Sequence, residues 1–330
     1  MTVIGAKGIL TVIVLLAAAP PPPAGEPVRI VFDTDMGNDV DDALALAMLH
    51  AFESRGEAKL LAVTITKDNR WAAPYVDLVN HYYGRGHIPI GMVRGGKTPE
   101  DSPMIRVPAE RRGAGGSRLY PRRLADGGQA GEAVAVLKRV LDGQPDRSVV
   151  VVQVGFSTNL ARLISETGGR SLVSRKVRLL VVMAGQFPTG KPEYNVKTDL
   201  EAAGTLFARW PTPIVASGYE IGEHILYPAR SIEEDFRWAP DHPVVDAYRA
   251  YQKMPYDRPT WDLTAVLHAV RPDRGYFSLS PSGTIRVDGQ GRTSLSPDPN
   301  GTHRYLTADA AGRARSLEAM IQLASQPPGR

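Results

Sequence analysis

The densest group of chemically active side chains is a segment that we call the acidic loop, residues 33–42, with the sequence Asp-Thr-Asp-Met-Gly-Asn-Asp-Val-Asp-Asp. Its five carboxylates repel one another unless a cation lies among them. Calcium takes about six to eight oxygen ligands from carboxylates, carbonyls and water. The alternative is that Asp41 and Asp42 merely cap a helix and interact with its dipole. The number of acids favours a metal site, with Asp35 and Asp42 as ligands.

Two other kinds of site can be compared with this segment. An EF-hand does not fit, because it needs ligands at alternate positions, a closing glutamate and a preceding helix. Asp33-Thr34-Asp35 by itself fits an Asp-x-Asp phosphatase, in which the first aspartate attacks phosphate and Mg²⁺ binds beside it. The continuation to Asp42 is not expected in such an enzyme. A phosphatase stays open as an alternative.

The elements that must position the acidic loop are a strand predicted before it, at residues 28–32, and a helix predicted after it, at residues 41–52. The same alternation continues along the chain. Further strands are predicted at residues 59–66, 88–93, 148–154, 177–183 and 213–217. Further helices are predicted at residues 71–83, 132–141, 159–165, 199–209, 244–251, 262–270 and 308–325. Continuous apolar strands separated by helices predict a single α/β domain, residues 26–330, with a mainly parallel, Rossmann-like sheet flanked by helices.

Binding sites in such sheets lie at the carboxyl ends of the strands. This rule selects a rim of segments at residues 33–42, 66–69, 155–159, 184–195 and 217–223. The passage to residue 128 is rich in glycine, proline and arginine and is predicted as a loop, as are residues 184–197. A hairpin is predicted through residues 276–287.

Composition excludes several classes of protein. Of the 330 residues, 43% are hydrophobic and 22% are charged, which excludes a disordered chain. The net charge of +4 is spread along the chain and gives little support for nucleic-acid binding. The arginine-rich residues 106–123 are interpreted as a solvated loop. The absence of cysteine excludes disulfides, thiolate ligands and a cysteine nucleophile.

The N-terminus has the pattern of a signal peptide. Lys7 precedes an apolar segment, residues 9–19, and four prolines lead to Ala24 and Gly25. The apolar segment is too short for an ordinary membrane span. We therefore expect residues 1–25 to be a signal peptide and the protein to be exported, either to a periplasm or into the medium. An uncleaved anchor is the alternative.

The acidic loop resembles the opening motif of the inosine–uridine-preferring nucleoside hydrolase family, Asp-Thr-Asp-Pro-Gly-x-Asp-Asp-Ala at the end of the first strand. Residues 33–35 and Gly37 match the front of the motif, and residues 41–43 match its back. Met36 replaces the proline, and two extra residues fall around positions 38–40. Other segments resemble family motifs in the same order along the chain, at residues 62–69, 154–161, 183–185, 193–195, 199–203 and 261–266.

The resemblance implies a Ca²⁺-dependent enzyme that hydrolyses the N-glycosidic bond of ribonucleosides to ribose and base. Calcium would orient a water and lower its pKa, and Asp35 would accept the proton of that water as general base. The implied metal ligands are Asp35, Asp42, Asp262 and the carbonyl of Thr158. The ribose hydroxyls would be bound by side chains of the types that read vicinal diols, namely Asp41, Asn69, Glu193 and Asn195.

Because of two departures from the family pattern, the sequence does not specify which nucleobase is released or which residue assists its departure. The histidine that precedes the last aspartate in some members is Trp261 here, and a second histidine has no counterpart in residues 92–96. Trp261 either stacks on the substrate base or is a core aromatic. Help for the leaving group could come from residues 106–123 or from Tyr219, Glu220 or His224.

Some of the same residues have a purely structural interpretation. Asn69 could cap the helix that follows it, and Asn159 is interpreted as a helix cap rather than a ligand. Asp33 is expected to support the turn, and Asp39, inside the insertion, has no assigned role. The alternatives for function are an enzyme of this fold acting on another N-riboside and a non-catalytic, metal-stabilised protein that binds ribose or nucleosides. The resemblance also implies a homodimer or homotetramer.

Overall fold

The computed structural model describes residues 25–329. Residues 1–24 of the expected signal peptide therefore lie outside the described residues. Between residues 25 and 329, no helix combines the length and the apolar character that crossing a membrane requires.

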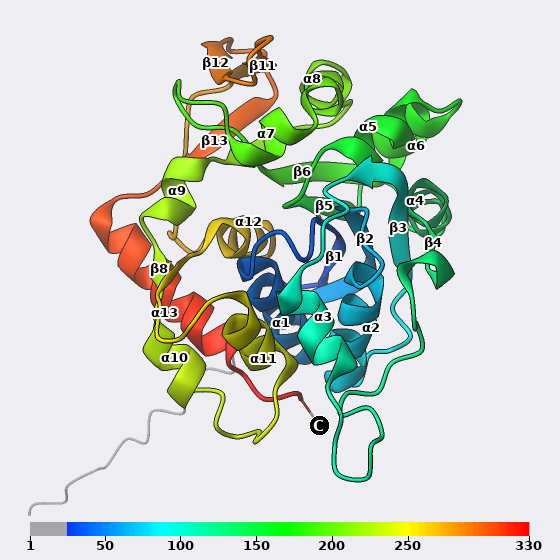
Figure 1. The fold of residues 1–330 in the computed structure, drawn as a ribbon. Helices are drawn as coiled ribbons and strands as arrows, with labels where there is room; N and C mark the ends of the chain where they lie inside the picture. The colour runs from blue at the N-terminus through cyan, green and yellow to red at the C-terminus, as the bar shows by residue number, and fades with distance from the viewer. Residues whose placement is uncertain (1–24, 330) are drawn as a thin grey trace, which may run out of the picture.

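A large sheet forms the centre of the fold (Figure 1). Within the described residues it contains eleven strands, in the order β12-β11-β13-β7-β6-β5-β1-β2-β3-β4, with β10 beside β13. Neighbours from β13 to β4 run parallel, whereas β10, β11 and β12 pair antiparallel. The predicted α/β fold with a mainly parallel sheet is confirmed. The strands of this sheet are β1 (Val28–Thr34), β2 (Ala58–Lys67), β3 (Ile90–Lys97), β4 (Gly131–Glu132), β5 (Val149–Gln153), β6 (Val177–Met183), β7 (Ile214–Ser217), β10 (Ser278–Leu279), β11 (Gly283–Val287), β12 (Thr293–Pro297) and β13 (His303–Thr307).

Helices cover both faces of the sheet (Figure 1). One layer contains α1 (Asp41–Ser54), α2 (Ala72–Tyr82), α3 (Pro103–Glu110), α11 (Pro243–Tyr251), α12 (Trp261–Val270) and α13 (Ala310–Ala324). The other contains α4 (Ala133–Asp142), α5 (Thr158–Ser165), α6 (Gly169–Lys176) and α8 (Leu200–Arg209). Shorter elements join these layers, namely η1 (Gly127–Gln129), α7 (Tyr194–Thr198), α9 (Tyr219–Glu223), α10 (Ala229–Glu234) and the strand pair β8 (Leu226–Tyr227) and β9 (Arg258–Pro259).

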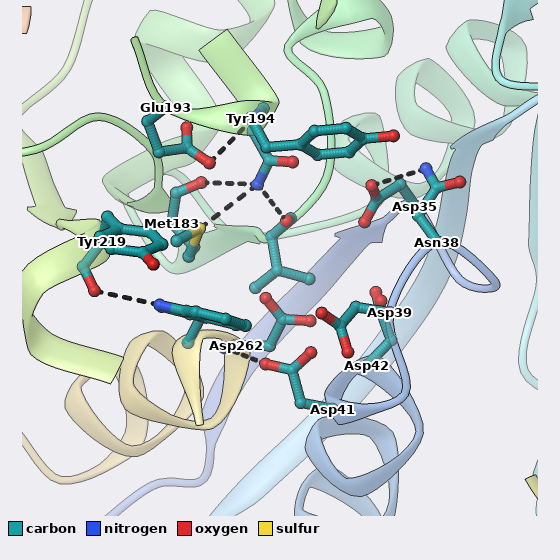
Figure 2. Close-up of a pocket in the computed structure, with 13 residues that line it drawn as sticks. Asp35, Asn38, Asp39, Asp41, Asp42, Met183, Glu193, Tyr194, Tyr219 and Asp262 are labelled. Carbon is teal, nitrogen blue, oxygen red and sulfur yellow. Dashed lines mark hydrogen bonds between the residues drawn. The ribbon is translucent and has the colours of Figure 1, made fainter. Parts of the chain in front are cut away.

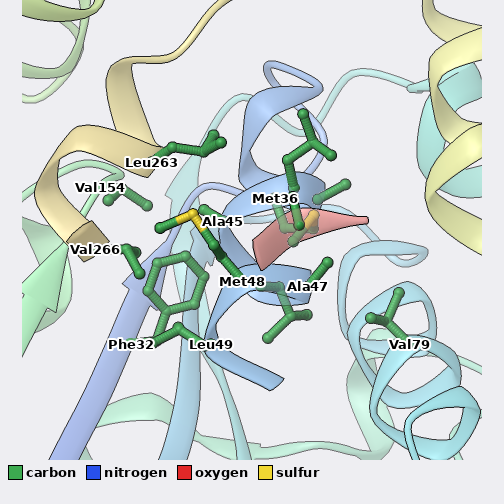
Figure 3. Close-up of a cluster of buried hydrophobic side chains, with 14 of the residues drawn as sticks. Phe32, Met36, Ala45, Ala47, Met48, Leu49, Val79, Val154, Leu263 and Val266 are labelled. Carbon is green, nitrogen blue, oxygen red and sulfur yellow. The ribbon is translucent and has the colours of Figure 1, made fainter. Parts of the chain in front are cut away.

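The alternation of side chains along β1 divides the apolar residues between two cores. Ile30 and Phe32 pack in the core beneath α1 and α12, whereas Val31 packs in the core on the opposite face. Figure 3 shows Phe32 and Met36 in the first of these cores, together with Leu263 from α12. Because both faces are buried, the central strands have no polar face, and their sequences are continuous apolar runs.

The position of β1 places the acidic loop at the centre of one edge of the sheet. The strands β2 and β3 follow β1 on one side, and β5, β6 and β7 follow on the other. The strand order therefore reverses between β1 and β5, and the crevice outside the carboxyl ends of such strands is where ligands bind in open α/β sheets.

Three predictions of local structure were wrong. The passage before residue 128, predicted as a loop, contains α3, which begins at Pro103 and buries a short apolar face against α11. Residues 184–197, also predicted as a loop, contain most of α7. The hairpin expected at residues 276–287 instead joins β11 to β12, with the turn at Asp288–Arg292. Elements this short form by packing on neighbours, which the local pattern does not show.

Candidate functional site

A cavity of about 320 Å³ lies at the carboxyl ends of the central strands, and Figure 2 shows its lining. The lining side chains come from the turn after β1, from the segments after β5 and β6, and from the starts of α9 and α12. They are Asp35, Asn38, Asp39, Asp41, Asp42, Val154, Met183, Glu193, Tyr194, Asn195, Tyr219, Trp261 and Asp262. Of the site residues predicted from sequence, the structure brings eight to this cavity, which are Asp35, Asp41, Asp42, Glu193, Asn195, Tyr219, Trp261 and Asp262.

Three of these residues form a close group that we call the acidic triad, Asp41, Asp42 and Asp262. One carboxylate oxygen from each lies within 4.8 Å of the others. Asp41 and Asp42 are the first two residues of α1, and Asp262 is the second residue of α12. The backbone N–H of Asp262 donates to Oδ2 of Asp41 at 3.0 Å, which holds the two helix starts together.

The surroundings of the acidic triad suit a cation. Thr34 Oγ1 donates to Oδ1 of Asp42, whereas Oδ2 of Asp42 is buried and has no hydrogen-bond partner among residues 25–329. Burial, and secondly repulsion between neighbouring carboxylates, raises the pKa of Asp41, Asp42 and Asp262 well above the ordinary value. Buried acids with an unpaired oxygen fit a hard cation, because its charge replaces the lost hydration and its coordination accepts oxygen donors alone.

Asp35 lies in the same cavity but, within the described residues, outside the acidic triad. Its side chain is buried, and Oδ2 accepts a hydrogen bond from Asn38 Nδ2 at 2.8 Å (Figure 2). Burial raises the pKa of Asp35 to about 7, and repulsion from Asp39 and Glu193 contributes. Asp41, which was expected to bind the ribose, thus belongs to the acidic triad. Asp35, which was expected to be a metal ligand, lines the same cavity outside the triad.

Asp33 has a structural role, as expected from the sequence, because its carboxylate links the end of β1 to β2 and α5. Its Oδ1 accepts hydrogen bonds from Thr64 Oγ1 at 2.5 Å and from Asn159 Nδ2 at 2.8 Å. The prediction that Asn159 caps a helix was wrong, because it lies inside α5 and its amide binds Asp33. Asp33 is fully buried and does not line the cavity, so it cannot act as the nucleophile that the phosphatase alternative requires.

Sequence reasoning missed the partner of Asp39. Arg258 Nε donates to Oδ1 of Asp39 at 2.9 Å, and Arg258 Nη2 donates to Oδ2 of Asp39. The same Nη2 also donates to the hydroxyl of Tyr251 at 3.0 Å. The signal available in the sequence was an arginine shortly before Asp262, but nothing local connects it with a loop so far upstream.

Glu193 and Asn195 shape the wall opposite the acidic triad. Glu193 is the N-cap of α7, and its carboxylate accepts from the backbone N–H groups of Gly185, Asn195 and Val196. Asn195 Nδ2 donates to the carbonyls of Val154 at 2.7 Å and of Met183 at 3.1 Å. Burial raises the pKa of Glu193 above its ordinary value. Both side chains therefore hold the loop after β6 in place while they line the cavity.

Aromatic side chains form another wall of the cavity. The rings of Tyr219 and Trp261 stack with centroids 5.4 Å apart, and Trp261 Nε1 donates to the carbonyl of Tyr219 at 3.0 Å. The guanidinium of Arg258 lies 5.4 Å from the centre of the Trp261 ring. Tyr194 is 47% exposed although it lines the cavity, so it presents an open aromatic face at the entrance.

Two predicted residues do not line this cavity. Asn69 Nδ2 donates to the carbonyls of Pro99 and Glu100, and its Oδ1 accepts from the backbone N–H of Trp71 at 2.8 Å. Thr158 Oγ1 donates to Asp199, and the Thr158 side chain lines a neighbouring cavity of about 310 Å³. Thr158 is the first residue of α5. The predicted metal ligand is its backbone carbonyl, which is independent of where the side chain lies.

Comparison with known proteins identifies the family of the chain. The sequence profile of the family described as inosine-uridine preferring nucleoside hydrolase matches residues 30–316. No curated protein sequence matches the chain.

Several solved structures share the fold. An inosine-uridine preferring nucleoside hydrolase from Bacillus anthracis aligns with a TM-score of 0.69 and 17% identity, over 90% of this chain and 99% of that one. A plant nucleoside hydrolase aligns with a TM-score of 0.65 and 22% identity, over 91% of this chain and all of the other (100%). The type III effector protein XopQ, complexed with adenosine diphosphate ribose, aligns with a TM-score of 0.64 and 16% identity, over 91% and 93%. The chain belongs to the inosine–uridine-preferring nucleoside hydrolase family, whose members are metal-dependent N-glycosidases.

Proposed function

We propose that the protein is a Ca²⁺-dependent ribonucleoside hydrolase that cleaves the N-glycosidic bond to give ribose and a free base. The observation that carries this proposal is the convergence of Asp35 and the acidic triad in one cavity at the switch point of the sheet. A buried, strongly acidic cavity favours the cationic sugar that develops as an N-glycosidic bond breaks.

The residues that would hold calcium are Asp35, Asp42, Asp262 and the carbonyl of Thr158. The unpaired, buried Oδ2 of Asp42 supports this assignment, as does the all-oxygen donor set. Asp41 presents an oxygen within 4.8 Å of those of Asp42 and Asp262, and in this proposal it also faces the ribose. Calcium, when bound, supplies a fixed positive charge that orients water and lowers its pKa.

Asp35 is the proposed general base. Asp35 accepts one proton of the attacking water as the water oxygen bonds to the anomeric carbon. The electron pair of the broken carbon–nitrogen bond stays on the leaving nucleobase, which takes up a proton from solvent to become the free base. Burial raises the pKa of Asp35 to about 7 in the metal-free protein. A cation beside Asp35 would lower this pKa and keep the carboxylate ionised, which is the form that accepts a proton from water. Because one of its oxygens is occupied by Asn38, the other is the one available to the water.

The ribose hydroxyls are assigned to Asp41, Asn69, Glu193 and Asn195. Three of the four line the cavity, which supports their assignment. Asn69 does not line it, and its amide donates to the carbonyls of Pro99 and Glu100. The base is assigned to the aromatic wall, where Trp261 offers a ring face next to Tyr219. Stacking binds a planar base without specifying it, so related N-ribosides belong to the same proposal.

Two properties of the whole protein complete the proposal. We propose export by the N-terminal signal peptide, supported by the charge and apolar pattern of residues 1–25. We also propose a homodimer or homotetramer, supported by resemblance to the family alone. Size-exclusion chromatography with light scattering and N-terminal sequencing of the exported protein test these two points.

The decisive experiment measures ribose release from a panel of purine and pyrimidine nucleosides, with Ca²⁺ and with a chelator. We expect release that depends on Ca²⁺ and that is lost in Asp35→Asn. No release from any N-riboside, together with measurable nucleoside binding, would identify a non-catalytic ribose-binding protein instead. Release that persists after metal removal would contradict the metal assignment while leaving the hydrolase assignment intact.

A further inference from the structure

The two-residue insertion brings the side-chain amide of Asn38 into hydrogen-bond contact with Asp35, the proposed general base. Asn38 Nδ2 donates to Asp35 Oδ2 at 2.8 Å and lies 3.1 Å from Thr98 Oγ1. Asn38 Oδ1 accepts a hydrogen bond from Lys67 Nζ at 2.9 Å, and Lys67 Nζ also donates to the carbonyl of Thr98 at 2.7 Å. Asn38 is therefore bonded at both ends of its amide.

The ammonium of Lys67 determines which way this amide points. Lys67 carries three donors and no acceptor, so only the oxygen of the Asn38 amide can face it. A flipped amide would set its NH₂ group against the ammonium and its oxygen against the carboxylate of Asp35. Both contacts would be repulsive, so the observed orientation is the one that satisfies Asn38, Lys67 and Asp35 together.

The surrounding backbone is built tightly around this contact. Gly37 has φ +111°, and a Cβ there would lie 2.6 Å from Cδ1 of Ile105 and 3.2 Å from Cδ of Lys67. Ser102 Oγ donates to the carbonyl of Gly37 at 2.6 Å. Thr98 has φ +52°, which is costly for a β-branched residue and marks a backbone that its contacts hold in place.

From these contacts we propose that Asn38 is a positioning residue, held by Lys67, that fixes the carboxylate of Asp35 in the orientation needed to accept a proton. The proposal rests on the proposed function, in which Asp35 is the base. One oxygen of Asp35 is held by the amide, which sets the plane of the carboxylate and leaves its other oxygen for the cavity. Lys67 acts through Asn38 and does not line the cavity itself.

Substitutions that keep side-chain volume test the proposal by steady-state kinetics. Asn38→Leu removes the amide, and Lys67→Met removes the cation. Each is expected to lower kcat roughly ten- to a hundred-fold, the size expected for losing one hydrogen bond to a charged group, while KM changes by less than about threefold. Lys67→Arg keeps a cationic donor and is expected to recover most of the lost kcat. Unchanged kcat in Asn38→Leu would overturn the proposal.

Lys97 provides the matched control, because it pairs with Lys67 in the register of β2 and β3 but does not line the active cavity. Lys97→Met is expected to keep the wild-type kcat, and an equal loss in Lys97→Met would mean that general charge, not Asn38, is responsible. If Lys67 acts through Asn38, Lys67→Met costs nothing further in an Asn38→Leu background. Independent, multiplicative losses would contradict the relay.

A structural readout separates this proposal from the proposed function. Crystal structures of the wild type and Asn38→Leu, with thermal denaturation to confirm folding, would show whether the Asp35 carboxylate rotates or becomes disordered. An unchanged Asp35 in well-folded Asn38→Leu would overturn the positioning role even if no nucleoside were hydrolysed. A wild type that releases no ribose would overturn the proposed function, and the crystal structures would still decide the role of Asn38.

Discussion

Arg258 holds Asp39 with two guanidinium nitrogens, and so it joins the turn after β1 to the strand that precedes α12. The Asp39 side chain is 25% exposed and that of Arg258 is 22% exposed, so water screens the pair only partly. The same guanidinium lies over the rings of Tyr251 and Trp261. Arg258 therefore balances the charge of Asp39 and also packs against the aromatic side chains Tyr251 and Trp261.

Removing the arginine should therefore destabilise the site. In Arg258→Met, Asp39 is left unpaired beside the acidic triad, and we expect the free energy of unfolding to fall by about 1–3 kcal/mol. Adding Asp39→Asn should restore most of that loss, because the uncompensated charge is then gone. Denaturant unfolding in the presence of chelator measures both changes.

The control for this prediction is the exposed pair Arg230–Glu234, whose side chains are 83% and 40% exposed. Arg230→Met should leave the free energy of unfolding nearly unchanged, because water screens this exposed pair. Equal changes in the free energy of unfolding for Arg258→Met and Arg230→Met would show that the Asp39–Arg258 pair stabilises the protein no more than an exposed ion pair does.

Stabilisation by calcium should increase with pH. Burial raises the pKa of Asp35 from 3.8 to about 7, so between these values the unfolded chain releases a proton that the metal-free folded protein keeps. The folded state then binds more protons, and the stability of the metal-free protein falls as the pH rises through this window. A cation removes this penalty by replacing the protons. The difference in Tm with Ca²⁺ and with chelator should therefore be small near pH 5 and larger near pH 8, and a difference that shrinks with pH would contradict the metal assignment.

Asp262→Asn should abolish most of the response to calcium. It removes one carboxylate of the acidic triad while keeping the backbone N–H that binds Asp41. We expect loss of the calcium-dependent increase in Tm, and calorimetric titration should show binding weaker by roughly a hundred-fold, because the affinity of a calcium site depends on the number of its charged ligands. Asp273→Asn, beyond the end of α12 and outside the triad, is the matched control and should bind calcium normally.

Asp35→Asn should reduce kcat by several orders of magnitude with little loss of stability. Asparagine keeps the shape of the side chain but cannot accept the proton of water. Single-turnover ribose release, with calcium saturating, measures the chemical step directly. Turnover close to that of the wild type would mean that another carboxylate of the acidic loop is the base, and Asp39 would be the next to test.

Trp261 should contribute to binding of the base more than to the chemical step. Trp261→Phe keeps a stacking face next to Tyr219 but loses the hydrogen bond to the Tyr219 carbonyl. We expect KM to rise by roughly two- to fivefold in Trp261→Phe and by at least tenfold in Trp261→Ala, because an aromatic contact contributes about 1 kcal/mol or more. A fall in kcat without a change in KM would place Trp261 in the leaving-group step instead.

The sequence was sufficient to predict the parallel centre of the sheet and the acidic part of the cavity lining, because both follow from local patterns. Apolar runs such as residues 149–153 predict buried strands, and the order of strands and helices puts the acidic loop at the carboxyl edge. Asp42 and Asp262 were found because each begins a helix within a motif.

What the sequence did not predict depends on contacts between distant segments. Arg258 and Asp39 are 219 residues apart, and only folding shows that they pair. Asn69 fits a site motif, yet its amide is bonded to a loop whose path the sequence does not specify. The apolar face of α3 is too short to be recognised by periodicity, and it becomes evident only when α11 packs on it.

The acidic triad also has a consequence for how the protein matures. Asp41 and Asp262 are 221 positions apart, so the acidic triad cannot be complete until α12 has packed beside α1. A nascent or truncated chain that ends before α12 would carry the acidic loop without its third carboxylate. The proposed calcium would then bind with all three carboxylates only after α12 has packed on α1, and it would stabilise complete chains more than truncated ones.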